Sequence, residues 1–330
     1  MEYVRLGRTG LQVSRLCLGT MTFGLQCDEE TSRAILDRAA EGGITFLDTA
    51  DAYPLGGDVD TTGRTEEIVG RWLTGRRQDF IIATKCFGVV GPNRWDRGNS
   101  RKHILDAIDA SLERLGTDYV DLYQLHGYDP NTPVEETLRA LEDIVRSGRA
   151  RYIGVSNWLA YQLARANGKA EALGLTRFDC IQPRYNLLFR EFERELFPLC
   201  REDGIGVIPY NPLAGGLLTG KHSPDAPPAE GTRFTLGNAA ANYQDRYWHD
   251  QEFETVEDIR LVADEAGLPL TQMAIAWVLA NPAVTAPIIG ASRPEQLRDS
   301  IQATIEPLAV DVKVRLDDIT EAYRMGDAVR

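Results

Sequence analysis

The sequence has little of several features that mark particular protein classes. Its 36 basic residues against 49 acidic residues leave a formal charge of −13, which repels phosphate backbones and anionic membrane surfaces. No apolar run approaches the roughly 20 residues that span a bilayer, and residues 1–13 lack a basic segment followed by an apolar stretch. We therefore expect no nucleic acid partner, no membrane association and a cytoplasmic location.

Cysteine and histidine are too scattered for a metal or disulfide framework. The five cysteines are an odd number without CxxC spacing, and the four histidines do not cluster with them. This pattern predicts reduced, mostly buried thiols of an intracellular protein and no bound metal.

What the sequence does have is a regular alternation of strand and helix patterns, in a composition that is 43% hydrophobic and 26% charged. Residues 3–14 predict a short hairpin that turns at residues 8–10. The expected strands are residues 15–18, 45–48, 80–85, 119–125, 152–156, 180–182, 206–210 and 286–289. The expected helices are residues 31–41, 65–73, 101–115, 134–146, 160–173, 192–203, 271–280 and 294–303.

This alternation predicts an α/β fold, a (β/α)8 TIM barrel with an N-terminal hairpin, in one domain over residues 1–330. The helix over residues 101–115 illustrates it, because Ser100 can cap its start and Gly116 can end it. A doubly wound open sheet is the alternative, but residues 19–24 lack the GxGxxG spacing of its phosphate turn. Three long irregular segments, residues 54–64, 87–99 and 222–251, follow strands and are expected to overhang the C-terminal face.

Four polar residues, Asp48, Tyr53, Lys85 and His126, fall at or just past strand ends. In a barrel these positions share one mouth. A nearby ammonium group stabilises a phenolate, so Lys85 is expected to move the pKa of Tyr53 toward neutrality, while Asp48 holds Lys85 charged. His126 can donate a hydrogen bond to a carbonyl oxygen. These groups suit carbonyl reduction, with a nicotinamide or flavin as hydride source.

Each of the four residues also has an ordinary structural explanation when it is taken alone. A strand-end aspartate can cap a loop, a tyrosine can be a packed aromatic, and a lone histidine is more often structural than catalytic. The combination at successive strand ends favours a shared catalytic role.

Five segments resemble the signature segments of the aldo-keto reductase superfamily, in that family's order. They are residues 47–53 (LDTADAY), 84–85 (TK), 121–126 (DLYQLH), 151–157 (RYIGVSN) and 290–297 (GASRPEQL). The resemblance implies a (β/α)8 barrel that binds NADPH/NADP+, with Asp48, Tyr53, Lys85 and His126 as catalytic tetrad and Tyr53 as proton donor.

The resemblance also implies cofactor contacts. Ser156, Asn157 and Gln182 match residues that bind the nicotinamide carboxamide, and Tyr210 matches an aromatic ring that stacks on the nicotinamide. Residues 211–221 resemble the pyrophosphate loop, and Ser292 with Arg293 at a helix start favours NADPH over NADH. The segment at residues 292–295 also reads as a capping box of Ser292 with Glu295. The remaining assigned positions are Gly19, Thr20, Met21, Asp48, Asn211, Pro212, Leu213, Gly215, Leu217, Lys221, Gly290, Gln296 and Ser300.

The sequence departs from the family's pattern in two places. Residues 54–64 are inserted after Tyr53, at the expected substrate mouth, and Arg298, Asp299 and Ser300 stand where many relatives have a residue for the adenine. The substrate is therefore open, although aromatic residues are expected at the mouth. These residues are Phe23, Phe87, Trp95, Tyr128 and Trp158.

These observations predict an NADPH-dependent reductase of an aldehyde or ketone. The alternative is a nicotinamide-binding sensor or regulatory subunit with little turnover, of the kind that voltage-gated potassium channel beta subunits represent. A barrel lyase or isomerase is disfavoured, because metal-ligand clusters and a conventional barrel phosphate motif are lacking. The expected partner is a small carbonyl substrate, and the sequence leaves homo-oligomerisation open.

Overall fold

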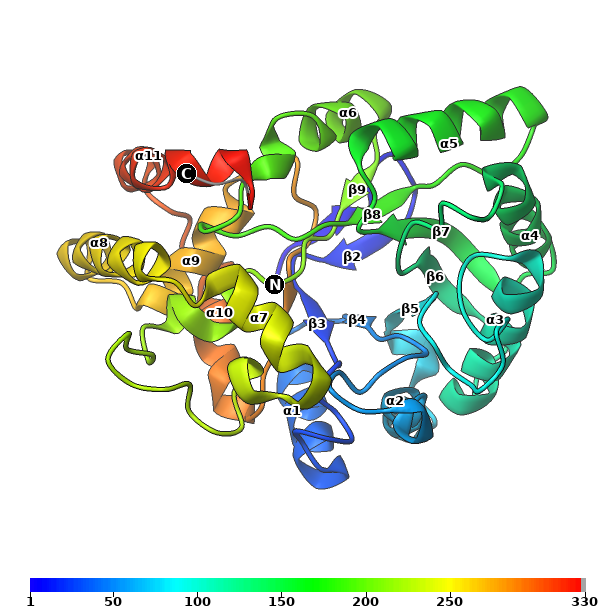
Figure 1. Ribbon diagram of the computed structural model, residues 1–330, viewed down its shortest axis with the longest axis horizontal. Helices are drawn as coiled ribbons and strands as arrows, with labels where there is room; N and C mark the ends of the chain where they lie inside the picture. The colour runs from blue at the N-terminus through cyan, green and yellow to red at the C-terminus, as the bar shows by residue number, and fades with distance from the viewer. Residues whose placement is uncertain (328–330) are drawn as a thin grey trace.

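The computed structural model describes residues 1–327, so the last three residues of the expected 1–330 domain lie outside it. Strands occupy the centre and helices surround them (Figure 1). The strands are β1 (Tyr3–Arg5), β2 (Gln12–Ser14), β3 (Cys17–Gly19), β4 (Phe46–Asp48), β5 (Ile81–Cys86), β6 (Val120–Leu125), β7 (Ala150–Ser156), β8 (Cys180–Gln182), β9 (Gly206–Val207) and β10 (Ile288–Ile289). The α-helices are α1 (Glu29–Glu41), α2 (Arg64–Leu73), α3 (Arg101–Leu115), α4 (Val134–Arg146), α5 (Ala160–Leu173), α6 (Leu196–Asp203), α7 (Ala240–Tyr247), α8 (Asp250–Ala266), α9 (Leu270–Leu279), α10 (Leu297–Gln302) and α11 (Val310–Ile319).

Within the described range, eight strands form one parallel sheet in the order β10-β3-β4-β5-β6-β7-β8-β9. The two ends of this order are joined, because Thr285 N donates to Val207 O at 2.8 Å and Ile288 N donates to Pro209 O at 2.8 Å. The predicted (β/α)8 barrel is therefore confirmed. Parallel strands covered by helices are buried on both faces, and β6 is buried along its whole length.

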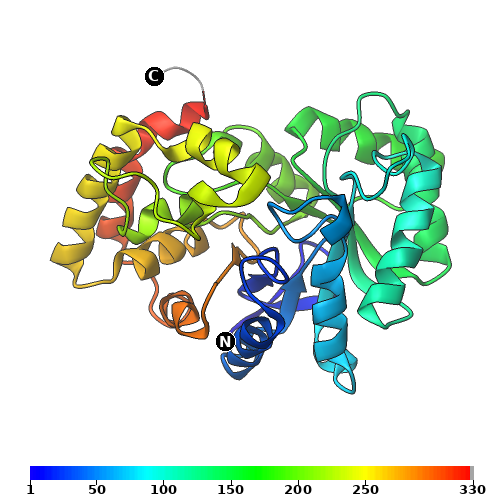
Figure 2. The same ribbon diagram turned by 60° about the horizontal axis from the view of Figure 1, so that its bottom comes forward.

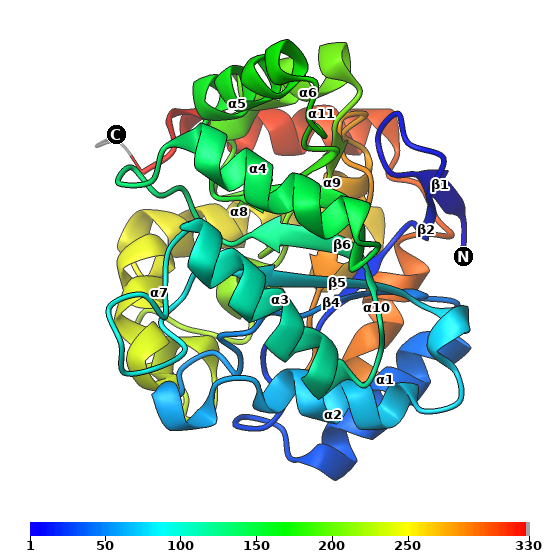
Figure 3. The same ribbon diagram turned by 90° about the vertical axis from the view of Figure 1, so that its right-hand side faces the viewer.

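The hairpin of β1 and β2 closes the N-terminal end of the barrel. Leu6 and Val13 are fully buried and pack with Phe46, Leu122 and Ile208 inside the barrel. The hairpin and α7 lie at opposite ends of the molecule (Figure 3). Solvent therefore reaches the barrel interior from the C-terminal face, where the catalytic residues were predicted.

Helix α3 begins and ends where the sequence predicted. The Ser100 side chain accepts a hydrogen bond from His103 N at 3.3 Å, and Gly116 takes the left-handed conformation with φ 61°. Ile104, Ile108 and Leu115 are buried on one face of the helix. Local capping residues and apolar spacing thus both indicate the observed bounds of this helix.

Several predicted boundaries are wrong, and proline explains three of them. The expected strands over residues 206–210 and 286–289 shorten to β9 and β10, because Pro209 and Pro287 have no N–H to donate to a neighbouring strand. The expected helix over residues 192–203 begins only at Leu196, which places Pro198 in its first turn, where a proline is tolerated.

Helices α7, α8 and α11 were not predicted. In α8, Phe253, Val256, Ile259 and Val262 recur at three-residue steps and are buried, so apolar periodicity would have identified this helix. In contrast, α7 has no such run, and Tyr243 and Tyr247 are its buried residues. The expected irregular segment of residues 222–251 therefore contains a helix.

The inserted residues 54–64 meet this segment above the barrel mouth. Gly56 (φ 88°) and Gly237 (φ 45°) touch so closely that a Cβ on Gly237 would lie 2.2 Å from Gly56 O. Leu55 N also donates to Met21 O at 2.9 Å, which fixes the start of the insertion against the loop after β3. Figure 2 shows α7 and its flanking loops across this face. Two of the three long segments thus cover the mouth, as expected.

All five cysteines are buried and free, as the sequence predicted. No helix among residues 1–327 is long and apolar enough to cross a membrane. Within the same residues, no group of three or more His, Cys, Asp or Glu side chains is arranged to hold a metal ion.

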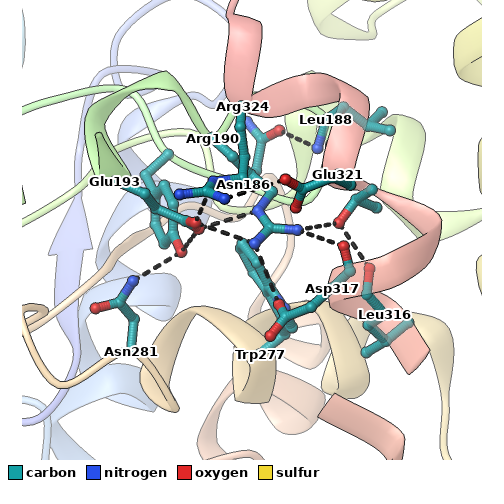
Figure 4. Close-up of polar contacts among 12 residues, drawn as sticks. Asn186, Leu188, Arg190, Glu193, Trp277, Asn281, Leu316, Asp317, Glu321 and Arg324 are labelled. Atoms are coloured by element: carbon teal, nitrogen blue, oxygen red, sulfur yellow. Dashed lines mark hydrogen bonds and ion pairs between the residues drawn. The ribbon is translucent and has the colours of Figure 1, made fainter. Parts of the chain in front are cut away.

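The C-terminal helices are attached to the barrel wall through Arg190, whose side chain is 6% exposed (Figure 4). Its guanidinium pairs with Glu193 at 3.0 Å and with Asp317 at 3.4 Å, and it donates to Thr320 Oγ1 at 2.8 Å. Trp277 Nε1 donates to the same Asp317 at 2.9 Å. One buried cation thus joins the loop after β8, helix α9 and helix α11.

Replacing Arg190 by methionine is expected to lower the free energy of unfolding by about 2 to 3 kcal/mol, since two carboxylates lose a largely buried partner. Urea unfolding measures this loss. Arg315→Met removes an exposed ion pair with Glu265 and should cost less than about 1 kcal/mol. Equal losses in both variants would contradict the structural role of Arg190.

Candidate functional site

A cavity of about 530 Å³ opens at the C-terminal face of the barrel. It receives side chains from strand ends β3, β4, β7, β8 and β10 and from the two covering segments. Seventeen of the predicted site residues line it: Gly19, Met21, Asp48, Tyr53, His126, Ser156, Asn157, Gln182, Tyr210, Asn211, Pro212, Leu213, Gly215, Lys221, Gly290, Ser292 and Gln296.

An ion pair between Asp48 and Lys85 lies at the floor of this cavity. Lys85 Nζ is 2.6 Å from Asp48 Oδ2, and the two side chains are 0% and 3% exposed. Lys85 Nζ also donates to the carbonyl of Thr49 at 2.8 Å. Burial is the largest single influence and lowers the pKa of Lys85, but the charges of Asp48 and Tyr53 and the hydrogen bonds to both together outweigh it, so the net shift is upward. Lys85 therefore stays charged, as the sequence predicted.

The second oxygen of Asp48 is held by two glutamines. Gln182 Nε2 donates to Asp48 Oδ1 at 2.9 Å and Gln124 Nε2 at 3.2 Å. Gln124 was not predicted to belong to the site, although it is a polar residue in the buried run of β6, two positions before His126. A polar side chain inside a barrel strand was the available signal. Asp48 is thus fixed by three hydrogen-bonding partners.

Tyr53 stands beside Lys85, with its hydroxyl 3.4 Å from Nζ and its side chain nearly buried. The sequence predicted a pKa of Tyr53 shifted toward neutrality, and this prediction is wrong. Burial raises the pKa of Tyr53, and the positive charge of Lys85 offsets only part of that rise. Tyr53 therefore stays protonated at neutral pH, which suits a group that gives a proton away.

His126 faces Tyr53 across the floor, with ring centroids 5.7 Å apart and a 77° angle between ring planes. Burial, aided by the charge of Lys85, lowers the pKa of His126 to about 3. The imidazole is therefore neutral at physiological pH, and one ring nitrogen is available as a hydrogen-bond donor. All four predicted tetrad residues meet at this floor.

The predicted carboxamide-binding residues form one hydrogen-bonded row beside the tetrad. Asn157 Nδ2 donates to His126 O at 2.9 Å, and Tyr210 OH donates to Asn157 Oδ1 at 2.9 Å. Ser156 Oγ donates to Gln182 O at 2.8 Å. Asn157 has φ 60°, a left-handed conformation that asparagine tolerates better than most residues. This row connects the wall of the cavity to its floor.

The loop after Tyr210 lines one arm of the cavity. Asn211 and Gly215 both have positive φ, 63° and 70°, and a Cβ on Gly215 would lie 2.8 Å from the Tyr243 ring. The side-chain nitrogen of Asn211 is buried among the described residues without a hydrogen-bond partner. A glycine-rich loop with an unpaired donor fits a ligand rich in oxygen acceptors.

Three cations lie near one another beside this loop: Lys221 and Arg233, which line the cavity, and Arg293, which is exposed and does not line it. Burial lowers the pKa of Lys221, and the charges of Arg293 and Arg233 lower it further. Arg233 Nη1 is buried with no hydrogen-bond partner in the described structure. Arg233 was missed because it lies in the irregular part of residues 222–251, where no pattern distinguishes it. The cluster suits a phosphate group.

The segment of residues 290–300 is arranged differently from the prediction. The backbone N–H of Ser292 donates its hydrogen bond to Gln296 Oε1 at 2.8 Å, and not to Glu295. The capping box of Ser292 with Glu295 is therefore wrong, while Pro294 does occupy the first turn. Ser300 is buried, and Asp299 lines the cavity in its place. Gln296 and Asp299 both line the cavity.

Thr20 and Leu217 are buried beneath the cavity surface. The Thr20 hydroxyl donates to Asp48 O at 2.9 Å, so it supports the catalytic strand end. Leu217 is part of the hydrophobic core. These two residues support the loops on which the cavity depends.

None of the five aromatic residues expected at the mouth, Phe87 included, lines the cavity. Phe23 and Trp158 are core residues. The Tyr128 ring packs on the Trp158 ring with centroids 5.0 Å apart, and Trp95 is 53% exposed. The side chains that line the cavity from the covering segments are instead Leu55, Thr232, Arg233, Ala239, Asn242, Tyr243 and Arg246.

A (β/α)8 barrel with a buried aspartate and lysine beneath a phenol and an imidazole defines a protein of the aldo-keto reductase type. The chain belongs to the Aldo/keto reductase family, whose sequence model matches residues 15–321. This membership supports an oxidoreductase.

Relatives named for different activities match nearly the whole chain. It is 41% identical to the uncharacterized oxidoreductase YrpG of Bacillus subtilis, over 97% of this chain and 96% of that protein. It is 40% identical to a probable voltage-gated potassium channel subunit beta of Arabidopsis thaliana, over 98% and 97%. It is 36% identical to versiconal hemiacetal acetate reductase of Aspergillus parasiticus, over 93% and 94%.

The low pKa of His126 predicts a stability loss in acid. As pH falls from about 6.5 toward 3, the unfolded chain takes up a proton on this histidine that the folded chain does not. Between pH 7 and pH 5 this difference should cost about 1 to 2 kcal/mol of unfolding free energy. His126→Asn should show a correspondingly smaller loss in urea unfolding at the two pH values. An identical loss in both proteins would contradict a buried neutral imidazole.

Proposed function

We propose that the protein is an NADPH-dependent oxidoreductase that reduces an aldehyde or ketone to an alcohol. The observation that carries this proposal is the protonated Tyr53 beside a buried, charged Lys85 at the floor of the cavity. The partner is a small carbonyl compound. The buried free thiols are consistent with a cytoplasmic location.

The site residues fit a nicotinamide nucleotide. Ser156, Asn157 and Gln182 line the cavity with amide and hydroxyl groups, and Lys221 and Arg233 line it with positive charge, to which the nearby Arg293 adds. The unpaired nitrogens of Asn211 and Arg233 face no described acceptor. When bound, the cofactor supplies the hydride that no side chain can deliver.

The residues then have separate roles in the reaction. Neutral His126 donates a hydrogen bond to the carbonyl oxygen and orients it, while Tyr53 gives that oxygen its proton. Lys85 stabilises the phenolate that Tyr53 becomes, because its charge lies 3.4 Å from the hydroxyl. Asp48 keeps Lys85 charged and in place.

Tyr53→Phe should retain NADPH binding and lose about 100-fold or more of kcat, since the proton donor is removed while the cavity keeps its shape. Cofactor binding is followed by fluorescence and turnover by NADPH consumption. Tyr161→Phe, at an exposed hydroxyl on α5, is the matched control and should turn over normally. Normal turnover by Tyr53→Phe would remove Tyr53 from its assigned role.

The preference for NADPH rests on the three-cation cluster. Arg293→Ala should weaken NADPH binding about 10-fold and NADH binding much less, because a charge-assisted contact to the 2′-phosphate is lost. Fluorescence titration with both nucleotides measures the two dissociation constants. Arg165→Ala removes an exposed charge on α5, outside the cavity, and is the control. Equal weakening of both nucleotides would argue against a 2′-phosphate contact.

A second candidate is a nicotinamide-binding sensor or regulatory subunit with little turnover. It is favoured by the 40% identity to the probable potassium channel subunit beta across nearly all of that protein. A panel of aldehydes and ketones separates the two candidates. Tight NADPH binding without turnover on any of them favours the sensor, and failure to bind either nucleotide removes both.

A further inference from the structure

Arg246 extends from α7 into the cavity. Asn242, Tyr243 and Arg246 all line it, because residues three and four positions apart share one face of a helix. Tyr243 lies close enough to Tyr53 to influence the ionisation of its hydroxyl. This face of α7 is therefore directed toward the catalytic floor.

Arg246 and Tyr210 line the same cavity, and the charge of Arg246 acts on the Tyr210 hydroxyl. Burial raises the pKa of Tyr210 to about 12, and the positive charge of Arg246 is the largest influence opposing that rise. Tyr210 in turn donates to Asn157, and Asn157 donates to the His126 carbonyl. Arg246 is thus next to the hydrogen-bonded row that leads to the tetrad.

Helix α7 is held firmly enough to place this charge. Tyr247, the neighbour of Arg246, is fully buried, and its hydroxyl accepts from Asn186 Nδ2 at 3.1 Å. Asn186, shown in Figure 4, also accepts from Leu188 N and donates to Asn211 O, each at 2.9 Å. The C-terminal end of α7 is therefore tied to the same loop that bounds the cavity.

Arg246 has no carboxylate partner among residues 1–327, which is unusual for an arginine in a cavity. Two of the other nearby cations have a carboxylate partner. Lys85 neutralises Asp48, and Arg184, which also acts on Tyr210, pairs with Asp327 at 2.5 Å. Lys221, Arg233 and Arg293 cluster around the loop of the other arm. Arg246 therefore brings an unmatched positive charge to the catalytic end.

We propose that Arg246 binds an acidic group of the substrate, so that the enzyme reduces carbonyl compounds that carry a carboxylate or a similar anion. This inference rests on the proposed function. An arginine offers a planar pair of N–H donors that matches a carboxylate. Because the protein as a whole carries −13 charges and repels anions at long range, selection of an acidic substrate needs such a local cation.

The test compares two aldehydes of similar shape, 4-carboxybenzaldehyde and its neutral methyl ester, methyl 4-formylbenzoate. The ratio of their kcat/KM values, acid over ester, should fall about 10- to 100-fold in Arg246→Gln, since a charge-assisted hydrogen bond is lost. Comparing the ratio between proteins cancels the different intrinsic reactivity of the two aldehydes. Arg246→Lys keeps the charge and should lose less of the ratio.

The matched control is Arg165→Gln, which removes the same charge from an exposed position on α5, outside the cavity. It should leave the acid-to-ester ratio unchanged. The same ratio measured as dissociation constants by calorimetry, with saturating NADP+ in place of NADPH, gives the answer without turnover. If the wild-type protein binds both aldehydes but reduces neither, the proposed reductase function fails while the role of Arg246 is still measured.

Two results would overturn the assignment of Arg246. One is an acid-to-ester ratio in Arg246→Gln equal to that of the wild-type protein, in both kinetics and binding. The other is a loss of NADPH affinity in Arg246→Gln with the ratio preserved, which would place the guanidinium in the cofactor site. A lower acid-to-ester ratio in Arg246→Gln, together with unchanged NADPH affinity, supports the assignment of Arg246.

Discussion

The C-terminal end of this barrel, with its cavity, depends on one buried ion pair, that of Asp48 and Lys85. A lysine with no exposed surface is tolerated only if its charge is matched, and here a carboxylate at 2.6 Å and a backbone carbonyl match it. The carboxylate in turn is held by Gln124 and Gln182, from two further strands. The pair therefore holds several strand ends together. It also fixes the position of the charges that act on the Tyr53 hydroxyl.

Much of the fold and of the catalytic floor could be predicted from the sequence. Apolar runs and capping residues located the strands and α3, and the tetrad followed from polar residues at strand ends. These features are local, so neighbouring residues are enough to determine them. The errors at β9, β10 and α6 arise where a proline decides the boundary within an otherwise continuous pattern.

The parts that could not be predicted depend on contacts between distant segments. The pKa of Tyr53 reflects how deeply the hydroxyl is buried, which no spacing of residues reveals. Arg233 and Arg246 reach the cavity because residues 222–251 fold back over the mouth, and Ser292 is satisfied by Gln296 because of the local turn geometry. Aromatic residues near the strand ends were expected at the mouth, but the barrel wall buries Phe23 and Trp158 in its core.

The contact between Gly56 and Gly237 joins a loop from one side of the barrel to a loop from the other. Because the backbones touch where no side chain would fit, neither loop can change its length or path without a matching change in its partner. The two loops should therefore vary together among relatives, as one inherited unit that sets the size of the entrance. Divergence of substrate choice within the family would then proceed by paired loop exchanges, while the floor beneath stays the same.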